Sequence, residues 1–217
     1  MTNMTFKVLC IIGSLLCLHA SWLPAKGWLS QALISYSWQQ SLAHQKVHQQ
    51  QILKKETNEI EINEKEKIQQ PAILNPLAEI KPWPWADTYP IAELSFERLD
   101  KNIVVLNGGD PTTLAFSAGA ITPFNQTHTN KPFIVAGHND SHFAFLEDIV
   151  MKDVISMRDQ QGKSQLYQVE NIDIIDASSG QFPVLPNDSS LILITCYPFN
   201  NIGNNRDERY IITAKLL

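Results

Sequence analysis

The strongest constraint on the fold of this chain is its division, after Pro90, into short apolar runs separated by turn residues. Runs of about four to eight residues rich in Val, Ile and aromatic side chains, bounded by Gly, Pro, Asn or Asp, are typical of β-strands. This pattern favours a small closed β-barrel or sandwich, with one short helix at His142–Val150. The eight predicted strands are Ile91–Phe96, Asn102–Asn107, Thr113–Phe116, Pro132–Ala136, Val154–Arg158, Gln165–Asp176, Ser190–Cys196 and Arg209–Leu216.

The N-terminal residues have the pattern of a targeting signal. Lys7 precedes the apolar run Val8–Leu18, and a positive residue before such a run is typical of a secretion signal or a signal anchor. With its flanking residues, the run approaches the roughly 20 residues that a membrane-spanning helix needs. A cleaved signal peptide is the alternative, but Leu18 is a poor first residue for a small-x-small cleavage site. We therefore predict a signal anchor, or transmembrane segment, over residues 1–25, with Lys7 on the cytoplasmic side.

Two segments of contrasting composition follow the predicted anchor. Residues 28–70 contain neither glycine nor proline and are rich in Gln, Glu and Lys, which favours helix. We predict a helical or partly disordered stalk over residues 26–70. Five prolines then fall within residues 71–90, a density that forbids helix and predicts an extended, Pro- and Trp-rich linker before the barrel domain at 91–217. A loose apolar stripe at helical spacing marks the stalk, at Trp28, Ala32, Leu33, Ser35, Tyr36 and Leu42.

The distribution of charge argues against nucleic-acid binding. The net charge is -5, and residues 1–70 carry seven Lys or Arg and five Glu. Residues 71–217 carry ten Lys or Arg and seventeen Asp or Glu. The predicted domain lacks the basic patch of a nucleic-acid-binding protein, so no nucleic-acid partner is expected.

Cysteine is the first candidate for chemistry. The chain has three, which are too few for a disulfide framework and form no CxxC pair for zinc. Cys10 and Cys17 lie in the N-terminal apolar run. Cys196 ends the continuous run Leu191–Cys196, which predicts a strand buried on both faces. Cys196 is therefore either a buried, inert thiol or a nucleophile at the end of a core strand.

A nucleophilic thiol needs an imidazole or a cation nearby. Three histidines belong to the predicted domain, and His138 follows an apolar run and a glycine, so it too stands at the end of a core strand. His142 is interpreted as a capping or surface residue, and His128 as a solvated loop residue.

A developing oxyanion also needs a positively charged donor. Arg209 immediately precedes a predicted strand and is held more rigidly than Arg206, which lies in a polar loop. Either arginine could instead form a surface salt bridge with Asp207 or Glu208.

Three motifs supply a histidine, a cysteine and an arginine in that order along the chain: Ala136-Gly-His138, Leu193-Ile-Thr-Cys196 and Arg209-Tyr-Ile-Ile. Together they resemble the sortases, the cysteine transpeptidases of the bacterial cell surface. The resemblance covers about residues 85–217 and implies an eight-stranded sortase-type β-barrel. The segments at 22–26, 81–90 and 137–143 look like the class GN sortases of marine Gram-negative proteobacteria.

Two positions depart from the family pattern. Ile192 stands where Thr or Ser is usual, and Asn139 follows the Gly-His motif where Arg is common. The first is not a catalytic position. The second alters contacts near the cleft and leaves His138 in place.

The resemblance implies a membrane-anchored cysteine transpeptidase. Cys196 would attack a Thr carbonyl in the C-terminal sorting signal of a secreted target protein, and His138 would protonate the leaving amine. Arg209 would bind the oxyanion, and Thr195 would support the strand end and contact substrate. An amine acceptor would then resolve the thioacyl enzyme. The chain would cross the inner (cytoplasmic) membrane once, with its catalytic domain in the periplasm.

No cofactor or metal is implied by this chemistry. Some sortases use calcium near the cleft, but the chain has no clustered carboxylate loop that would argue for it. Two alternatives stay open. One is a cysteine peptidase of the same fold that hydrolyses the acyl-enzyme. The other is a non-catalytic, anchored β-barrel binding module in which Cys196 is inert.

Overall fold

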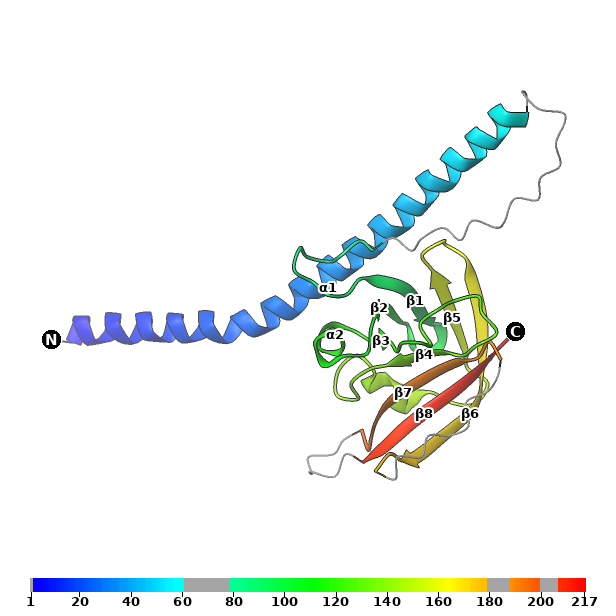
Figure 1. The fold of residues 1–217 in the computed structure, drawn as a ribbon. Coiled ribbons are helices and arrows are strands. Elements are labelled where there is room, and N and C mark those ends of the chain that lie inside the picture. The colour runs from blue at the N-terminus through cyan, green and yellow to red at the C-terminus, as the bar shows by residue number, and fades with distance from the viewer. Residues whose placement is uncertain (1, 61–78, 179–187, 200–206) are drawn as a thin grey trace.

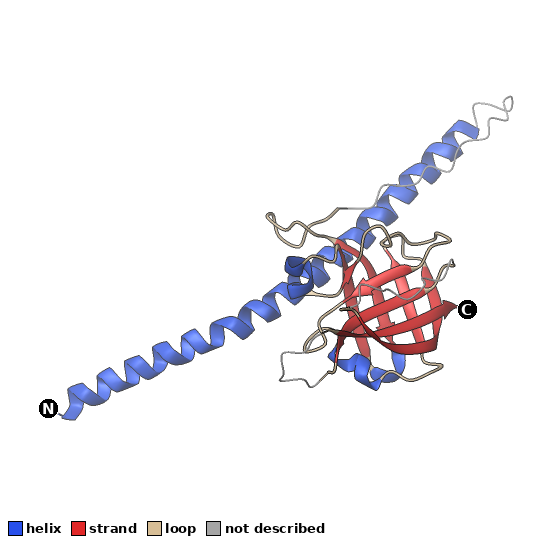
Figure 2. Ribbon diagram, turned by 60° about the horizontal axis from the view of Figure 1, so that its bottom comes forward, coloured by secondary structure: helices blue, strands red, loops and turns tan. Residues whose placement is uncertain are grey.

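The structure is a computed structural model that describes residues 2–60, 79–178, 188–199 and 207–217. Among these residues eight strands close into one barrel, in the order β1-β2-β3-β4-β7-β8-β6-β5 (Figures 1 and 2). The mainly-β, eight-stranded barrel expected from the sequence is confirmed. The strands are β1 Pro90–Phe96, β2 Lys101–Asn107, β3 Gly119–Ala120, β4 Phe133–Ala136, β5 Val154–Asp159, β6 Ser164–Asp176, β7 Leu191–Tyr197 and β8 Glu208–Leu216. The helices are α1 Thr2–Ile60, α2 Pro111–Phe116 and the 3-10 helices η1 Glu97–Leu99 and η2 Ala144–Asp148.

All eight strands contribute side chains to one apolar core inside the barrel. Alternate residues of each strand point inward, as a closed sheet requires. On β7, for example, Leu191 and Leu193 lie in this core and are fully buried. Phe143 and Leu146, from the loop after β4 and from η2, are also fully buried in it. The barrel is therefore filled by side chains and is not a channel.

One predicted strand is wrong. Residues 113–116 belong to helix α2, which begins at Pro111. The carboxylate of Asp110 accepts hydrogen bonds from the backbone N–H groups of Thr112 and Thr113, at 3.0 Å each, and so caps the helix. Proline at the first helical position reinforces this start. The eighth strand is instead the two-residue β3, Gly119–Ala120.

The other predicted elements hold their places. The seven remaining strands begin and end within one residue of their predicted bounds. The helix predicted at His142–Val150 is the shorter 3-10 helix η2. Gly162, with φ of +78°, lies in the turn between β5 and β6, where a left-handed conformation suits glycine.

Helix α1 lies along the barrel and extends beyond it at both ends (Figures 1 and 2). Its middle packs against β1, β2 and α2. The buried face follows helical spacing and comprises Ile34, Ser37, Trp38, Ser41, Leu42 and Gln45. Trp28 and Tyr36 are 75% and 64% exposed, so the expected apolar stripe is not the face that packs. Leu42 is the one residue that both sets share.

Helix α1 also contains the segment predicted as a signal anchor. No helix in the described ranges has both the length and the apolar character needed to cross a membrane. The division of the chain at residues 25, 70 and 90 stays a prediction, and residues 61–78 lie outside the described residues. In the described part of the predicted linker, Trp83 packs edge-on against Phe116, with ring centroids 4.7 Å apart, whereas Trp85 is 80% exposed.

Candidate active site

The three predicted catalytic residues lie at one end of the barrel. Strands β4 and β7 are parallel, with Ala136 opposite Ile194, so their carboxyl ends meet. Strand β8 is antiparallel to β7 and begins at this same end. His138 follows β4 by two residues, Cys196 is the last residue but one of β7, and Arg209 is the second residue of β8. Three adjoining strands thus bring together an imidazole, a thiol and a guanidinium. We call this end the catalytic end of the barrel.

Cys196 and Arg209 form a directly opposed pair in the β7–β8 ladder. Side chains alternate between the two faces of a strand. Leu193 is in the barrel core and Ile194 is in a second, outer cluster, so Cys196 lies on the outer face. On β8, Ile211 belongs to the outer cluster, so Arg209 lies on the outer face too. Directly opposed side chains have Cβ atoms about 4.5–5.5 Å apart, so the side chains of Cys196 and Arg209 start next to each other. Arg209 Nη1 donates to the Glu208 carbonyl at 2.9 Å.

His138 is exposed on the loop that leaves β4. The backbone holds this loop at both sides of the histidine. Gly137 N–H donates to the Ile194 carbonyl at 3.2 Å, and Phe143 N–H donates to the His138 carbonyl at 2.9 Å. The imidazole is therefore accessible to solvent and substrate while its backbone stays joined to β7.

Two side-chain hydrogen bonds flank His138 and Cys196. Thr195 Oγ1 donates to the Gly137 carbonyl at 2.7 Å, and Asn139 Nδ2 donates to the Pro198 carbonyl at 3.0 Å. Each bond joins a residue next to the histidine to a residue one or two positions from the cysteine. The first is a physical basis for the strand-end support expected of Thr195, whose contact with substrate stays a prediction.

An aromatic cluster lies behind the site, on the inner face of β7 and β8. Tyr197 stacks on Tyr210 with centroids 6.1 Å apart and an interplanar angle of 15°, and Phe199 meets Tyr210 edge-on at 5.1 Å. Burial raises the pKa of Tyr210, and Tyr197 and Glu147 raise it further. Sequence reasoning missed this cluster, although the aromatic residues that follow Cys196 and Arg209 were its signal. The cluster packs against the strand ends that carry Cys196 and Arg209.

The remaining candidates are placed differently. His142 lies on the same loop as His138, and burial lowers its pKa, with a smaller lowering from the charge of His138. His128 pairs with Asp159, the last residue of β5, at the end of the barrel away from Cys196. Arg206 lies outside the described residues. Within the described ranges, no three His, Cys, Asp or Glu side chains gather into a metal site.

A closed β-barrel with a thiol, an imidazole and a guanidinium on adjoining strand ends has the parts of a cysteine-dependent acyl-transfer enzyme. The model of the sortase domain matches residues 94–217, and the chain belongs to the sortase family. Sortases are cysteine transpeptidases.

Individual relatives are distant. Sortase D of Bacillus subtilis (strain 168) is 25% identical over 123 residues, which cover 56% of this chain and 61% of that protein. Sortase A from Corynebacterium diphtheriae superimposes with a TM-score of 0.53 at 22% identity, over 61% of this chain and 63% of that one. A Clostridium perfringens Sortase D5 transpeptidase superimposes with a TM-score of 0.50 at 21% identity, over 59% of this chain and 79% of that one. The chain therefore spans less than two thirds of the length of the first two, and its class GN character stays a prediction.

Proposed function

We propose that this protein is a membrane-anchored transpeptidase. It cleaves a secreted protein within its C-terminal sorting signal and transfers the secreted protein to an amine. The observation that carries the proposal is the opposed pair Cys196 and Arg209 on the outer face of β7 and β8, with His138 at the adjoining end of β4. A thiol beside a fixed cation is the arrangement that thioester chemistry needs.

The first half of the reaction forms a thioacyl enzyme. With the thiol proton held by His138, the sulfur of Cys196 bonds to the carbonyl carbon of the scissile amide, while Arg209 donates to the carbonyl oxygen as negative charge develops there. The amide C–N bond breaks as His138 gives a proton to the leaving amine. In the second half the nitrogen of an amine bonds to the thioester carbon, the carbon–sulfur bond breaks with its electron pair going to the sulfur of Cys196, and His138 takes the proton of the amine. The target protein leaves with a new amide bond.

The outer face of the strands beside the thiol carries a cluster of buried isoleucines. Ile134, Ile192 and Ile211 form an apolar layer on the outer face of β4, β7 and β8, and Ile194 packs against it. This layer leads along β7 to Cys196. Its three isoleucines are only 2–4% exposed, so the layer is already covered, and the partly exposed Ile194 is the apolar side chain that a peptide would contact next to Cys196.

We also propose that the chain crosses the inner membrane once, with the barrel in the periplasm. Lys7 before the apolar run Val8–Leu18 supports an N-in anchor. The side chains of Phe6, Ile11 and Leu16 on this part of α1 are 60–67% exposed, as lipid contact would require. Protease added to spheroplasts should degrade the barrel domain, and carbonate extraction should leave the chain in the membrane. Release by carbonate would overturn the anchoring.

The catalytic proposal is tested with a peptide library. A cleaved peptide is identified with the wild-type protein, and Cys196→Ala and Arg209→Ala are then compared. Cys196→Ala should abolish cleavage, and Arg209→Ala should lower kcat by about 10²–10³ through loss of an oxyanion donor. Circular dichroism checks that both variants are folded. Formation of an amide with added amine separates transpeptidation from hydrolysis, and cleavage by Cys196→Ala would refute the proposal.

A further inference from the structure

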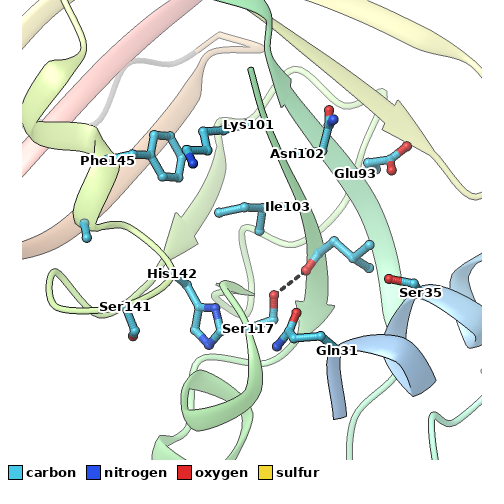
Figure 3. A pocket seen from close by; sticks show the side chains of 12 residues that line it. Gln31, Ser35, Glu93, Lys101, Asn102, Ile103, Ser117, Ser141, His142 and Phe145 are labelled. Atoms are coloured by element: carbon cyan, nitrogen blue, oxygen red, sulfur yellow. Dashed lines mark hydrogen bonds between the residues drawn. The ribbon is translucent and has the colours of Figure 1, made fainter. Parts of the chain in front are cut away.

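A polar pocket lies between helix α1 and the catalytic end of the barrel (Figure 3). Its volume is about 370 Å³, in the range of small-molecule sites. Gln31 and Ser35 of α1 form one wall, and Lys101 and Asn102 of β2 form another. His142 reaches in from the loop after β4, on the side of the pocket where Gln31 lies. Amide and hydroxyl groups on these walls suit the backbone of a peptide.

The pocket carries one uncompensated charge, and it is positive. Glu93 also lines the pocket, but Arg158 Nη2 donates to its carboxylate at 2.6 Å and balances its charge. Burial lowers the pKa of His142 and so favours its uncharged form. Lys101 forms no ion pair with any residue that the structure describes. A ligand with a carboxylate would therefore find its partner at Lys101.

The pocket is at the catalytic end, on the side of His138 that faces away from β7 and β8. Leu106 of β2 is level with Ala136 of β4 through Gly119, and β2 runs opposite to β4, so the amino end of β2 at Lys101 lies beyond the end of β4, on the side of the loop that carries His138. The apolar layer lies on the other side, over β4, β7 and β8. His142 is close enough to His138 for their charges to interact. An amine that enters from this pocket would meet His138 first.

The span between pocket and thiol fixes the size of the ligand. Three inter-strand steps separate β2 from β7 and amount to roughly 14 Å at about 4.8 Å each, and Lys101 lies three residues, or roughly 10 Å, farther along the strand direction than Cys196. The two displacements combine to roughly 17 Å, and an extended peptide advances about 3.4 Å per residue, so roughly four to five residues cover this distance once the Lys101 side chain spans part of it.

We propose that this pocket is the acceptor subsite, which binds the carboxylate of a short peptide at Lys101 and directs its free amine past His142 to the thioester. This inference rests on the proposed function. In the step that it serves, the amine nitrogen bonds to the thioester carbon, and the carbon–sulfur bond breaks with its electron pair going to the sulfur of Cys196. The proton lost by the amine passes to His138.

The test uses the full-length protein in detergent, a cleaved sorting peptide, and two acceptors: tetraglycine and tetraglycine amide. Amide product and hydrolysed product are separated by liquid chromatography and mass spectrometry. The wild type should show a KM for tetraglycine that is lower by roughly three- to fivefold, as expected for one solvated ion pair of about 1 kcal/mol. Lys101→Gln should remove this preference by raising the KM for tetraglycine alone.

Two further variants sharpen the result. Ser35→Trp, on the exposed face of α1, should fill the pocket and raise the KM for both acceptors. Lys163→Gln changes an exposed lysine next to Gly162 at the opposite end of the barrel and should keep the wild-type preference. Hydrolysis of the sorting peptide without acceptor reports the proposed function separately. If the wild type does not hydrolyse the sorting peptide, the proposed function fails. If transfer proceeds and the KM for tetraglycine is the same in the wild type and in Lys101→Gln, the acceptor subsite is overturned.

Discussion

The hydrogen bond from Thr195 to the Gly137 carbonyl offers the sharpest test of how the site is held together. Thr195→Val keeps the β-branched shape and removes only the hydroxyl. Thr195 is 2% exposed and the bond is 2.7 Å long, so the change leaves a buried carbonyl without its donor. An unsatisfied buried acceptor costs about 1–3 kcal/mol, and we expect the free energy of unfolding to fall by that amount.

The same substitution should also lower catalysis. The bond lies between the residue before His138 and the residue before Cys196, so its loss lets the imidazole move relative to the sulfur. A displacement of about 1 Å at a reacting group can cost about 10²-fold in rate. We therefore expect kcat for peptide cleavage to fall by roughly 10- to 100-fold, with KM nearly unchanged.

The assay pairs urea unfolding with steady-state cleavage of the sorting peptide. Thr195→Ser keeps the hydroxyl and serves as the matched control, which should retain most of the wild-type kcat. Asn139→Ala removes the second flanking bond, to the Pro198 carbonyl. Because both bonds set one spacing, the double variant should lose less than the sum of the single losses. Wild-type kcat in Thr195→Val would refute the reasoning.

Three other substitutions probe the frame around the site. Gly137→Ala would place a Cβ 2.7 Å from the Phe143 ring, so the loop that carries His138 must shift, and kcat/KM should fall at least tenfold in the peptide assay. Trp38→Ala empties the buried face of α1 at a cost of about 3–5 kcal/mol, and limited proteolysis should then cut α1 next to the barrel sooner than in the wild type. Asp110→Ala removes the cap of α2 and should cost about 1 kcal/mol in urea unfolding at pH 7. The hydrogen bonds from Thr113 lower the pKa of Asp110 below 3.8, so the wild type should lose this stabilisation only as the pH falls below that value.

Much of the barrel is predictable because its strands are local patterns. Runs such as Leu191–Cys196 are continuous, apolar and bounded by turn residues, and they fix their own limits. Helix α2 is predicted as a strand because its β-branched and aromatic residues are typical of strands. The signal that marks it as a helix is the Asp-Pro pair at 110–111, where the helix begins. Strand β3 has only two residues, too few to show any period.

The packing of α1 could not be predicted from an apolar stripe. Its buried face includes Ser37, Ser41 and Gln45, whereas the exposed face carries Trp28 and Tyr36. The hydroxyls of Ser37 and Ser41 bond back to carbonyls of their own helix, which lets polar residues enter the interface.

The site divides in the same way into local and non-local parts. The strand-end positions of His138 and Cys196 follow from the apolar runs before them. The opposition of Cys196 and Arg209 depends on the register of β8 against β7, which no local pattern specifies. The bonds made by Thr195 and Asn139 bridge 58 and 59 residues of sequence, so only the folded barrel brings them together.

The direction in which α1 crosses the barrel has a geometric consequence. Gln31 bonds to the Phe116 carbonyl and lines the pocket at the catalytic end, whereas Trp38 lies over Arg158, toward the far end of β5. The N-terminal part of the helix therefore leaves the barrel on the side where His138 and Cys196 lie. With the proposed anchor in the bilayer, the site faces the membrane. The length of the helix then sets both the height and the orientation of the barrel above the membrane. Each residue inserted between 25 and 31 would raise the barrel by about 1.5 Å and rotate it by about 100° about the helix axis.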